Sequence, residues 1–200
     1  MLHLRVLKSR SEPLEVAAAR VCREAGARVA ENQLVRDLNA DNVIDGRKID
    51  SRKIEVIANG LPLWGGAQLA VDTALVSALT RDGQPRAKNA FTDTRDQKNK
   101  TYHELVNGKR CRLVVLTFEV GGRWSEEAFN FIRMLAKVKA ESSPRLLRRS
   151  AELLWFRRWT GLLACAAQSV YATTLLELPL KARGACCING FEPALADLDR

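Results

Sequence analysis

Residues 68–79 read QLAVDTALVSAL, a run of small and aliphatic side chains that one carboxylate, Asp72, interrupts. Mostly apolar runs of this length are typical of strands that are buried on both faces of a sheet. A buried carboxylate costs several kcal/mol unless it is paired or binds a metal. The stretch therefore predicts a central strand. It also predicts that Asp72 either bonds to backbone or an arginine in a structural role, or holds a ligand.

The sequence on both sides of this strand shows helical and strand patterns in a regular order. Helical spacing of apolar residues, alternation along strands, Gly26 as a helix stop and Ser125 as a helix cap define the elements. Together they predict an α/β (α+β) domain with a mixed β-sheet flanked by helices. The expected elements are a helix over 15–26, strands over 28–38, 53–58 and 68–79, a charged loop over 39–52, a polar stretch over 81–98, a helix over 99–106, a strand over 112–120 and a helix over 125–140.

A further long helical pattern covers residues 145–178 and is basic at its start and apolar toward its end. Its uncharged part, residues 160–176, contains Thr, Gln and Ser and is shorter than the roughly 20 apolar residues that a membrane span needs. We therefore expect a buried helix and no membrane contact. Trp155 and Trp159 lie four residues apart, a spacing that favours packing in the core over stacking on bases.

Composition and charge favour a polyanionic partner. The 200 residues include 32 Lys and Arg against 23 Asp and Glu, which leaves a net charge of +9. An excess of this size favours nucleic acid over an acidic small molecule, so no small-molecule cofactor is expected. The five cysteines form no C-x-x-C pair and there are two histidines, which predicts reduced, structural thiols and no zinc site of ordinary spacing. Residues 1–15 carry charges where a signal peptide needs an apolar run, so we expect an intracellular protein.

Two more residues could act together with Asp72. Glu55 lies on the strand predicted over 53–58, and Lys98 follows the central strand. Two acidic side chains on adjacent strands make an oxygen-rich site that suits Mg²⁺. Each residue also has an ordinary interpretation, since Glu55 can be an exposed residue of an edge strand and Lys98 a solvated helix cap.

The order of three short motifs resembles a known family. Residues 52–55 read RKIE, residues 69–73 read LAVDT and residues 98–102 read KNKTY. In this order they are similar to the R-P-x-D-type segment, the hydrophobic D-x-T/V-V strand and the K-x-x-K/R-Y helix of the restriction-like, PD-(D/E)xK endonuclease domain of non-LTR retrotransposons. The similarity continues through the strand over 113–120, the GGRW turn and the following helices, and it covers roughly residues 15–178.

The resemblance implies a restriction-endonuclease-like sheet and a metal-dependent DNA endonuclease that hydrolyses a phosphodiester bond and leaves a 3′-hydroxyl. Glu55 and Asp72 would bind Mg²⁺ or Mn²⁺, and Lys98 and Lys100 would be catalytic. Arg52 and Tyr102 would contact nucleic acid. Glu55 stands where the family has Asp, Lys53 replaces its proline, and Ala74 occupies the position of the lysine in restriction enzymes, so the lysine must come from the following helix.

The same resemblance divides the chain into a nuclease core over 1–124, a C-terminal helical extension over 125–178 and a poorly ordered tail over 179–200. The family's preceding reverse transcriptase needs a Tyr/Phe-x-Asp-Asp motif, which this sequence lacks. We therefore expect a fragment of a retrotransposon protein, located in the nucleus, with DNA as its partner and the element RNA as a second candidate.

Five arginines at the start of the last helix could follow a DNA backbone and make the affinity depend on salt. They are Arg145, Arg148, Arg149, Arg157 and Arg158. The ordinary alternative is a solvated basic face. Two other functions remain open at this stage: a catalytically decayed DNA- or RNA-binding module of the same origin, and an interaction protein whose hydrophobic C-terminal helix pairs with a partner.

Overall fold

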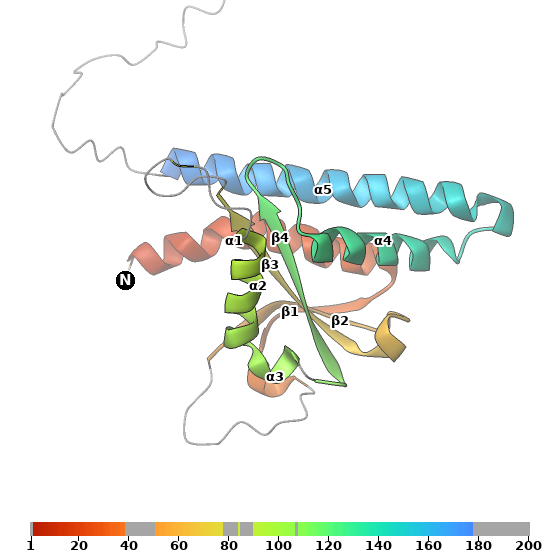
Figure 1. Cartoon of the computed structure of the whole chain (residues 1–200), viewed down its shortest axis with the longest axis horizontal. Helices are drawn as coiled ribbons and strands as arrows, with labels where there is room; N and C mark the ends of the chain where they lie inside the picture. Colours follow the sequence, from red (N-terminus) through yellow and green to blue (C-terminus); the bar gives the residue numbers. More distant parts are fainter. Residues whose placement is uncertain (1, 39–50, 78–83, 85–89, 107, 178–200) are drawn as a thin grey trace, which may run out of the picture.

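A computed structural model describes residues 2–38, 51–77, 84, 90–106 and 108–177. Within them, a four-stranded mixed sheet is covered by α1 and α4 on one face and by α2 and α3 on the other, and α5 lies across α1 and α4 (Figure 1). The elements are α1 (Leu2–Ala25), β1 (Arg28–Leu34), β2 (Lys53–Asn59), β3 (Gln68–Val76), α2 (Ala90–Thr101), α3 (His103–Val106), β4 (Cys111–Glu119), α4 (Glu126–Ala140) and α5 (Arg148–Glu177).

The strand order in the sheet is β1-β2-β3-β4. The first three strands form an antiparallel meander, and β4 runs parallel to β3 because α2 and α3 carry the chain back along the sheet. The predicted order of a helix, three strands, a helix and a strand is confirmed, and β3 is an interior strand as its apolar run indicated. The fold is therefore a mixed α/β sheet flanked by helices.

Two buried clusters lie on the two faces of the sheet. Leu69 and Val71 of β3 pack with α1, α4 and α5, whereas Ala70 packs with the cluster that includes Tyr102 and Leu105. Since successive side chains of a strand point to opposite faces, Asp72 points to the side of α2 and Thr73 to the side of α1. The register of β3 thus determines the side on which each polar residue lies.

The described elements depart from the expected boundaries in several places. Helix α1 begins at Leu2 rather than at residue 15 and contains Pro13. Its first turns are rich in Leu, Arg and Lys, which have high helix propensity. The apolar spacing on which the predicted start was based gives no signal in this segment. Strand β1 ends at Leu34, and a short 3₁₀ helix over Val35–Asp37 follows because the buried Val35 turns the chain inward. Most of the loop expected over 39–52 and the tail over 179–200 lie outside the described residues.

The largest error concerns residues 90–98, which were expected to be irregular but form most of α2. Among the twelve residues of this helix only Ala90 is buried, so the apolar periodicity that marks most helices is missing. The helix predicted over 99–106 is instead the end of α2 and the separate short helix α3, with Tyr102 between them. The spacing of apolar residues did not predict this helix because α2 contacts the sheet through polar side chains.

The ends of two other helices agree with the predicted signals. Gly26 has φ of 109° and donates to the Arg23 carbonyl, while the next residue donates to the Cys22 carbonyl, which is the Schellman ending of a helix. At α4, the Ser125 hydroxyl accepts a hydrogen bond from the Ala128 N–H at 3.2 Å. Both predicted boundaries are confirmed.

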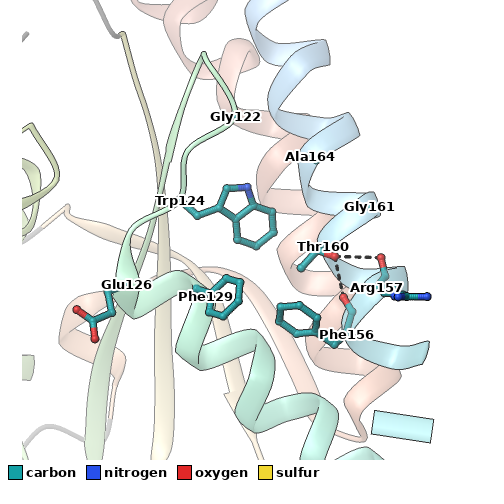
Figure 2. A pocket seen from close by; sticks show the side chains of 9 residues that line it. All are labelled: Gly122, Trp124, Glu126, Phe129, Phe156, Arg157, Thr160, Gly161 and Ala164. Atoms are coloured by element: carbon teal, nitrogen blue, oxygen red, sulfur yellow. Dashed lines mark hydrogen bonds between the residues drawn. The ribbon is translucent and has the colours of Figure 1, made fainter. Parts of the chain in front are cut away.

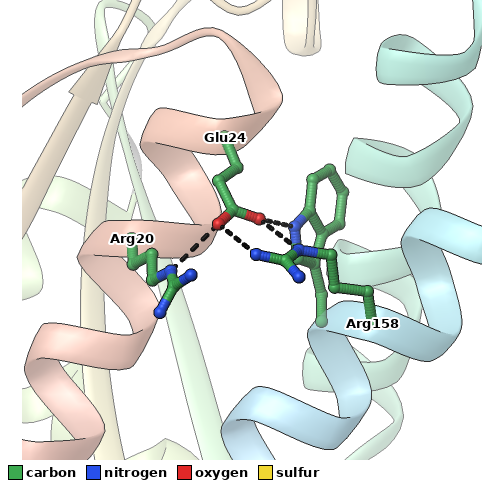
Figure 3. A network of polar contacts seen from close by, with 4 residues as sticks. Arg20, Glu24 and Arg158 are labelled. Carbon is green, nitrogen blue, oxygen red and sulfur yellow. Dashed lines mark hydrogen bonds and ion pairs between the residues drawn. The ribbon is translucent and has the colours of Figure 1, made fainter.

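The C-terminal helix is fixed to α1 by a polar network (Figure 3). Arg158 donates two hydrogen bonds to the Glu24 carboxylate, each at 2.9 Å, and the Trp159 indole N–H donates a third at 2.9 Å. Arg20 approaches the same carboxylate at 2.9 Å. Trp159 is fully buried, which confirms its predicted place in the core.

Helices α4 and α5 contribute to the same buried cluster as α1 and the sheet. The division of the chain at residue 124 stays a prediction. Within the described residues, most of the buried side chains of the helices beyond it belong to the same cluster as those of the sheet. The described cysteines are free, with Cys22 and Cys111 buried and Cys165 exposed. In the described part of the chain, no helix has both the length and the apolar character required to cross a bilayer.

Strand β4 forms one edge of the sheet, and side chains cover its outer side. Glu127, in the first turn of α4, accepts a hydrogen bond from the Val115 N–H at 3.2 Å and pairs with Arg95 of α2 at 2.9 Å. Further along, Phe118 forms a bridge with Trp124. The edge is therefore closed at several of its backbone groups.

Candidate active site

The two predicted acids lie where β2 and β3 stop pairing. The antiparallel register joins Val56 to Val71, and one further step would set Glu55 opposite Asp72. In the described sheet the pairing ends before that step. On the other side of β2, Asn32 has φ of 54° and is skipped by the register with β1. Side chains rather than backbone pairs therefore satisfy the polar groups around Glu55.

Glu55 bonds to β3 through its side chain. Its Oε2 atom accepts hydrogen bonds from the N–H and from the hydroxyl of Thr73, each at 2.7 Å. The carboxylate thus takes the place of a backbone acceptor at the point where the two strands part. These bonds leave Oε1 without a donor among the described residues, so this oxygen is available to another ligand.

Asp72 is buried, with 1% of its surface exposed. The ammonium group of Lys98 on α2 lies 2.5 Å from Asp72 Oδ2 and supplies the partner that a buried carboxylate requires. Neither oxygen of Asp72 has a hydrogen bond of regular geometry within the described residues. Lys98 itself is one quarter exposed, so the ion pair connects the interior with the surface.

Burial raises the affinity of both acids for protons. Burial and the nearby Asp72 charge raise the pKa of Glu55 to about 8, against the opposing effect of the Thr73 bonds. Burial also raises the pKa of Asp72, and Lys98 opposes that change. A site in which two acids resist ionisation is one in which a cation would be bound favourably.

Glu15 on α1 is a third acid that the sequence analysis did not select. Its charge contributes to the raised pKa of Glu55, which places the two carboxylates near each other. A signal was present, since residues three, four and seven positions further along the helix lie on the same face. These residues, Ala18, Ala19 and Cys22, are all buried. An acid on the buried side of an amphipathic helix could therefore have been selected from its spacing.

The donor atoms suit a hard divalent cation. Mg²⁺ is typically held by one or two carboxylates and completes its shell with water and substrate phosphate. Glu55 and Asp72 are near enough for the Asp72 charge to raise the pKa of Glu55. Asp72 is paired with Lys98, and Glu55 is bonded to Thr73. Among the described residues, no group of three or more His, Cys, Asp and Glu side chains is arranged to hold a metal. The pair alone is thus the candidate protein ligand set.

Arg52 and Tyr102, which were expected to contact nucleic acid, lie close to this site but bond to protein. Arg52 donates to the Glu104 carboxylate at 2.5 and 3.2 Å and also bonds to the Thr101 carbonyl. Tyr102 is buried and donates to the Lys53 carbonyl at 3.0 Å. Both residues therefore fasten β2 to the end of α2, which holds Lys98 in place.

Lys100 lies two residues after Lys98 on α2 and is exposed. With 3.6 residues per turn, side chains two positions apart point about 200° away from each other. Lys98 contacts Asp72, so Lys100 points away from the acids. The structure does not bring these two predicted catalytic lysines together.

The five predicted DNA-binding arginines are all exposed at the start of α5 or just before it. Arg158 is engaged with Glu24, and Arg148 donates to the Ser143 carbonyl at 3.3 Å. Because α5 lies over α1 and α4, this basic segment and Lys98 are on opposite sides of the sheet (Figure 1). A nucleic acid that touched both would have to extend around the molecule.

A polar pocket of about 360 Å³ opens beside Lys98. The C-terminal half of β3 forms one wall and α2 forms the other, with Thr94, Gln97 and Thr101 along the helix. Lys98 is thus shared between the pocket and the ion pair with Asp72. A polar ligand in this pocket would contact the partner of the buried acid, while Asp72 itself is not part of the lining.

An apolar groove of about 800 Å³ lies elsewhere, between the turn after β4, α4 and α5 (Figure 2). Trp124, Phe129 and Phe156 form its aromatic lining, and Gly161 and Ala164 of α5 keep it open. Phe129 is 43% exposed. The groove contains one carboxylate, Glu126, and lacks the paired acids found between β2 and β3.

No protein-family model matches this chain, and no curated protein matches it significantly.

Proposed function

We propose that this protein is a metal-dependent DNA endonuclease of the restriction-like, PD-(D/E)xK type, which hydrolyses a phosphodiester bond and leaves a 3′-hydroxyl. The observation that carries the proposal is the placement of two acids at the point where β2 and β3 separate, with a lysine from the next helix on one of them. Buried acids with raised pKa values next to a cation are typical of functional sites.

The fold supports the same proposal. The structure has a mixed four-stranded sheet, with a helix before the first three strands and helices between the third and fourth. This arrangement is compatible with the restriction-endonuclease-like fold that the resemblance of the motifs implies. Ala74, where restriction enzymes have a lysine, leaves Asp72 without a cation from its own strand. Lys98 reaches Asp72 from α2 instead, as the resemblance to the retrotransposon family leads us to expect.

The residues of the site have separate tasks in this proposal. Glu55 and Asp72 would hold Mg²⁺ or Mn²⁺, which when bound lowers the pKa of a water and neutralises charge on the phosphate. Thr73 orients the Glu55 carboxylate through its two hydrogen bonds. Lys98 is placed to bind a phosphate oxygen or to orient the attacking water, and the pocket beside it would admit the DNA strand.

The partner in this proposal is DNA, with RNA of the parent element as the second candidate. The net charge of +9 supports a nucleic acid as partner. We propose further that the chain is part of a retrotransposon reverse transcriptase and endonuclease protein, and that it acts in the nucleus.

Cleavage of supercoiled plasmid by the purified protein tests the proposal. The intact protein should nick the plasmid with Mg²⁺ or Mn²⁺ and not with EDTA, and both Asp72→Ala and Lys98→Ala should abolish nicking. Lys137→Ala removes an exposed lysine on α4 and serves as the matched control. Activity that survives in both site variants, or an inactive intact protein, would overturn the proposal. Salt-sensitive DNA binding without cleavage would favour the decayed binding module.

A second candidate function, protein interaction through α4 and α5, is favoured by the apolar groove and by exposed leucines. Leu146 is 96% exposed and Leu154 67% exposed. Exposed apolar surface of this kind commonly marks an interface. Sedimentation over a range of concentrations tests it, because assembly without affinity for nucleic acid would support interaction over nuclease activity.

A further inference from the structure

The end of the sheet at which β3 and β4 begin carries a group of basic side chains. Lys109, Arg110 and Arg112 lie at the start of β4, and Arg28 stands opposite Asn59 at the same end of the sheet. All four are exposed. The two segments that form this end, residues 56–71 and 105–118, contain no Asp or Glu. Neither segment contributes an acid, and Glu127 of α4 is near enough for the Arg112 charge to oppose the rise in its pKa.

A polar pocket of about 380 Å³ lies within this end of the molecule. Lys109 and Arg110 line one side of it, and the turn from Trp64 to Gln68 lines the other. Asn59 completes the lining. None of these lining residues is acidic, so the pocket offers hydrogen-bond donors and positive charge to an anion.

Trp64 has an uncommon conformation in this turn. Its φ is 46°, in the left-handed region that non-glycine residues seldom adopt. Gly65 and Gly66, which follow it, also have positive φ values of 71° and 81°. Strained residues of this type are concentrated at binding sites and persist only when their surroundings hold them. Here Phe131 stacks with the indole, at 6.3 Å between ring centres and 7° between planes.

Arg112 is oriented by this tryptophan. The guanidinium carbon lies 4.7 Å from the centre of the Trp64 ring, so the flat face of the group is used for stacking. Its N–H groups lie in the plane of the guanidinium, so stacking on the ring does not occupy them. No described residue accepts a hydrogen bond from them. A planar fork of donors held in this way matches the oxygens of a phosphate.

We propose that Arg112, Lys109 and Arg110 form a binding site for the phosphate backbone of nucleic acid, with Trp64 orienting Arg112. The site goes beyond the nuclease proposal, because it requires neither metal nor the acids of β2 and β3. Asp72 lies four residues from Gln68 along β3, or about 13 Å at the rise of a strand. Arg112 stacks on Trp64, which stacks on Phe131 of α4, whereas Asp72 contacts Lys98 on the side of α2, so a duplex that contacted both would have to pass around this end of the sheet.

Binding of a labelled short duplex in EDTA, measured by fluorescence anisotropy over a series of salt concentrations, tests the site. Arg110→Gln/Arg112→Gln should weaken binding about tenfold and make the dependence of log K on log salt shallower by about 1.8, since each phosphate contact contributes about 0.9. The control Arg133→Gln/Lys137→Gln removes the same charge from exposed positions of α4 and should change the affinity less than about twofold.

The variant Arg112→Lys distinguishes recognition by the planar guanidinium group from attraction by positive charge alone. The lysine retains the charge but lacks the planar fork and stacks less well on Trp64. We expect it to weaken binding about threefold, whereas a nonspecific surface would be unaffected. All of the substituted residues are exposed, and thermal melts would verify that each variant is folded.

Three results would overturn this inference. The first is an equal loss of affinity in Arg110→Gln/Arg112→Gln and in the control Arg133→Gln/Lys137→Gln. The second is the absence of DNA binding by the intact protein. The third concerns inorganic phosphate. If phosphate stabilised the intact protein but not Arg110→Gln/Arg112→Gln, while both proteins bound the duplex equally, the pocket would be a site for free phosphate. Because the measurement needs no cleavage, an inactive protein that binds DNA through Arg112 would refute the nuclease proposal and retain this one.

Discussion

At the scale of single residues, the Glu55 side chain has one stabilising and one destabilising effect on the fold. Its hydrogen bonds from Thr73 hold the ends of β2 and β3 together, whereas its charge is placed near Asp72 and Glu15. The folded protein consequently binds a proton at Glu55 more tightly than the unfolded chain does. A carboxylate in such a place is kept at the expense of stability, which is common at functional sites.

Glu55→Gln should stabilise the metal-free protein, because the amide oxygen can still accept from Thr73 and the charge is gone. The pKa of Glu55 is about 8 in the folded state and 4.5 when unperturbed. The destabilising charge is therefore absent at pH values below the lower figure and fully present above the higher one. We expect a gain of about 2 kcal/mol near pH 9 and almost none near pH 4. Urea unfolding in EDTA at both pH values measures it, and a larger gain at the acidic pH would contradict this account.

Lys98 and Asp72 should be strongly coupled in stability. Lys98→Met leaves Asp72 buried without its cation and should cost about 3 kcal/mol, because an unpaired buried charge is unfavourable. Adding Asp72→Asn should recover most of this loss while cleavage stays absent. Urea unfolding of the two single variants and the double variant gives the coupling energy. Additive losses would show that the pair is not formed in solution.

At the scale of secondary-structure elements, the contact between α1 and α5 depends on Glu24. Hydrogen bonds from Arg158, with those from Trp159 and Arg20, lower the pKa of Glu24 to about 2. Since the folded pKa is below the ordinary value of 4.5, the stabilisation is complete above that value and is lost as the pH falls toward 2. The hydrogen bonds that join α1 and α5 through Glu24 are therefore weakened at acidic pH.

Glu24→Gln should therefore lower the free energy of unfolding by about 2 kcal/mol near neutral pH and by much less near pH 2. Urea unfolding of both proteins across this range measures the difference. Glu12→Gln, which removes an exposed acid from the same helix, is the control. A loss that does not depend on pH would assign the effect to packing rather than to the ionised carboxylate.

The elements also show which sequence signals were reliable. The apolar runs of β3 and β4 and the capped, amphipathic α4 were predicted almost to their ends, because burial of one face or both dictates their composition. Helix α2 was missed because its contacts with the sheet are polar, such as Lys98 with Asp72. Glu15 was overlooked although the helical spacing places it on the buried side of α1, because its neighbour Glu55 is distant in sequence.

At the scale of the whole molecule, positive charge is placed at several separate sites. The basic start of α5 lies on the side of α1 and α4, Lys98 lies on the side of α2, and Arg112 lies at the end of the sheet. A DNA duplex that reaches Lys98 would meet the α5 arginines only if it curved around the protein. Binding and cleavage should consequently respond to different residues.

Arg145→Gln/Arg149→Gln should raise the DNA concentration needed for half-maximal cleavage by up to about tenfold, with a weaker dependence on salt. The rate at saturating DNA should be unchanged, because these side chains are remote from Asp72 and stabilise the bound state and the transition state equally. Steady-state cleavage at several DNA concentrations measures both quantities. A fall in the saturated rate would place α5 next to the scissile bond.

The closed outer edge of β4 has a consequence for how the protein behaves at high concentration. Unpaired edge strands recruit strands of other molecules and start aggregation. Glu127 occupies the Val115 N–H, and Trp124 bridges to Phe118. The Glu127 carboxylate, which Arg95 holds in position, thus keeps this part of the edge from pairing with another molecule. Loss of Glu127 would expose the Val115 N–H on a strongly apolar edge strand to strands of other molecules, so resistance to aggregation depends in part on a residue that has no role in the proposed chemistry.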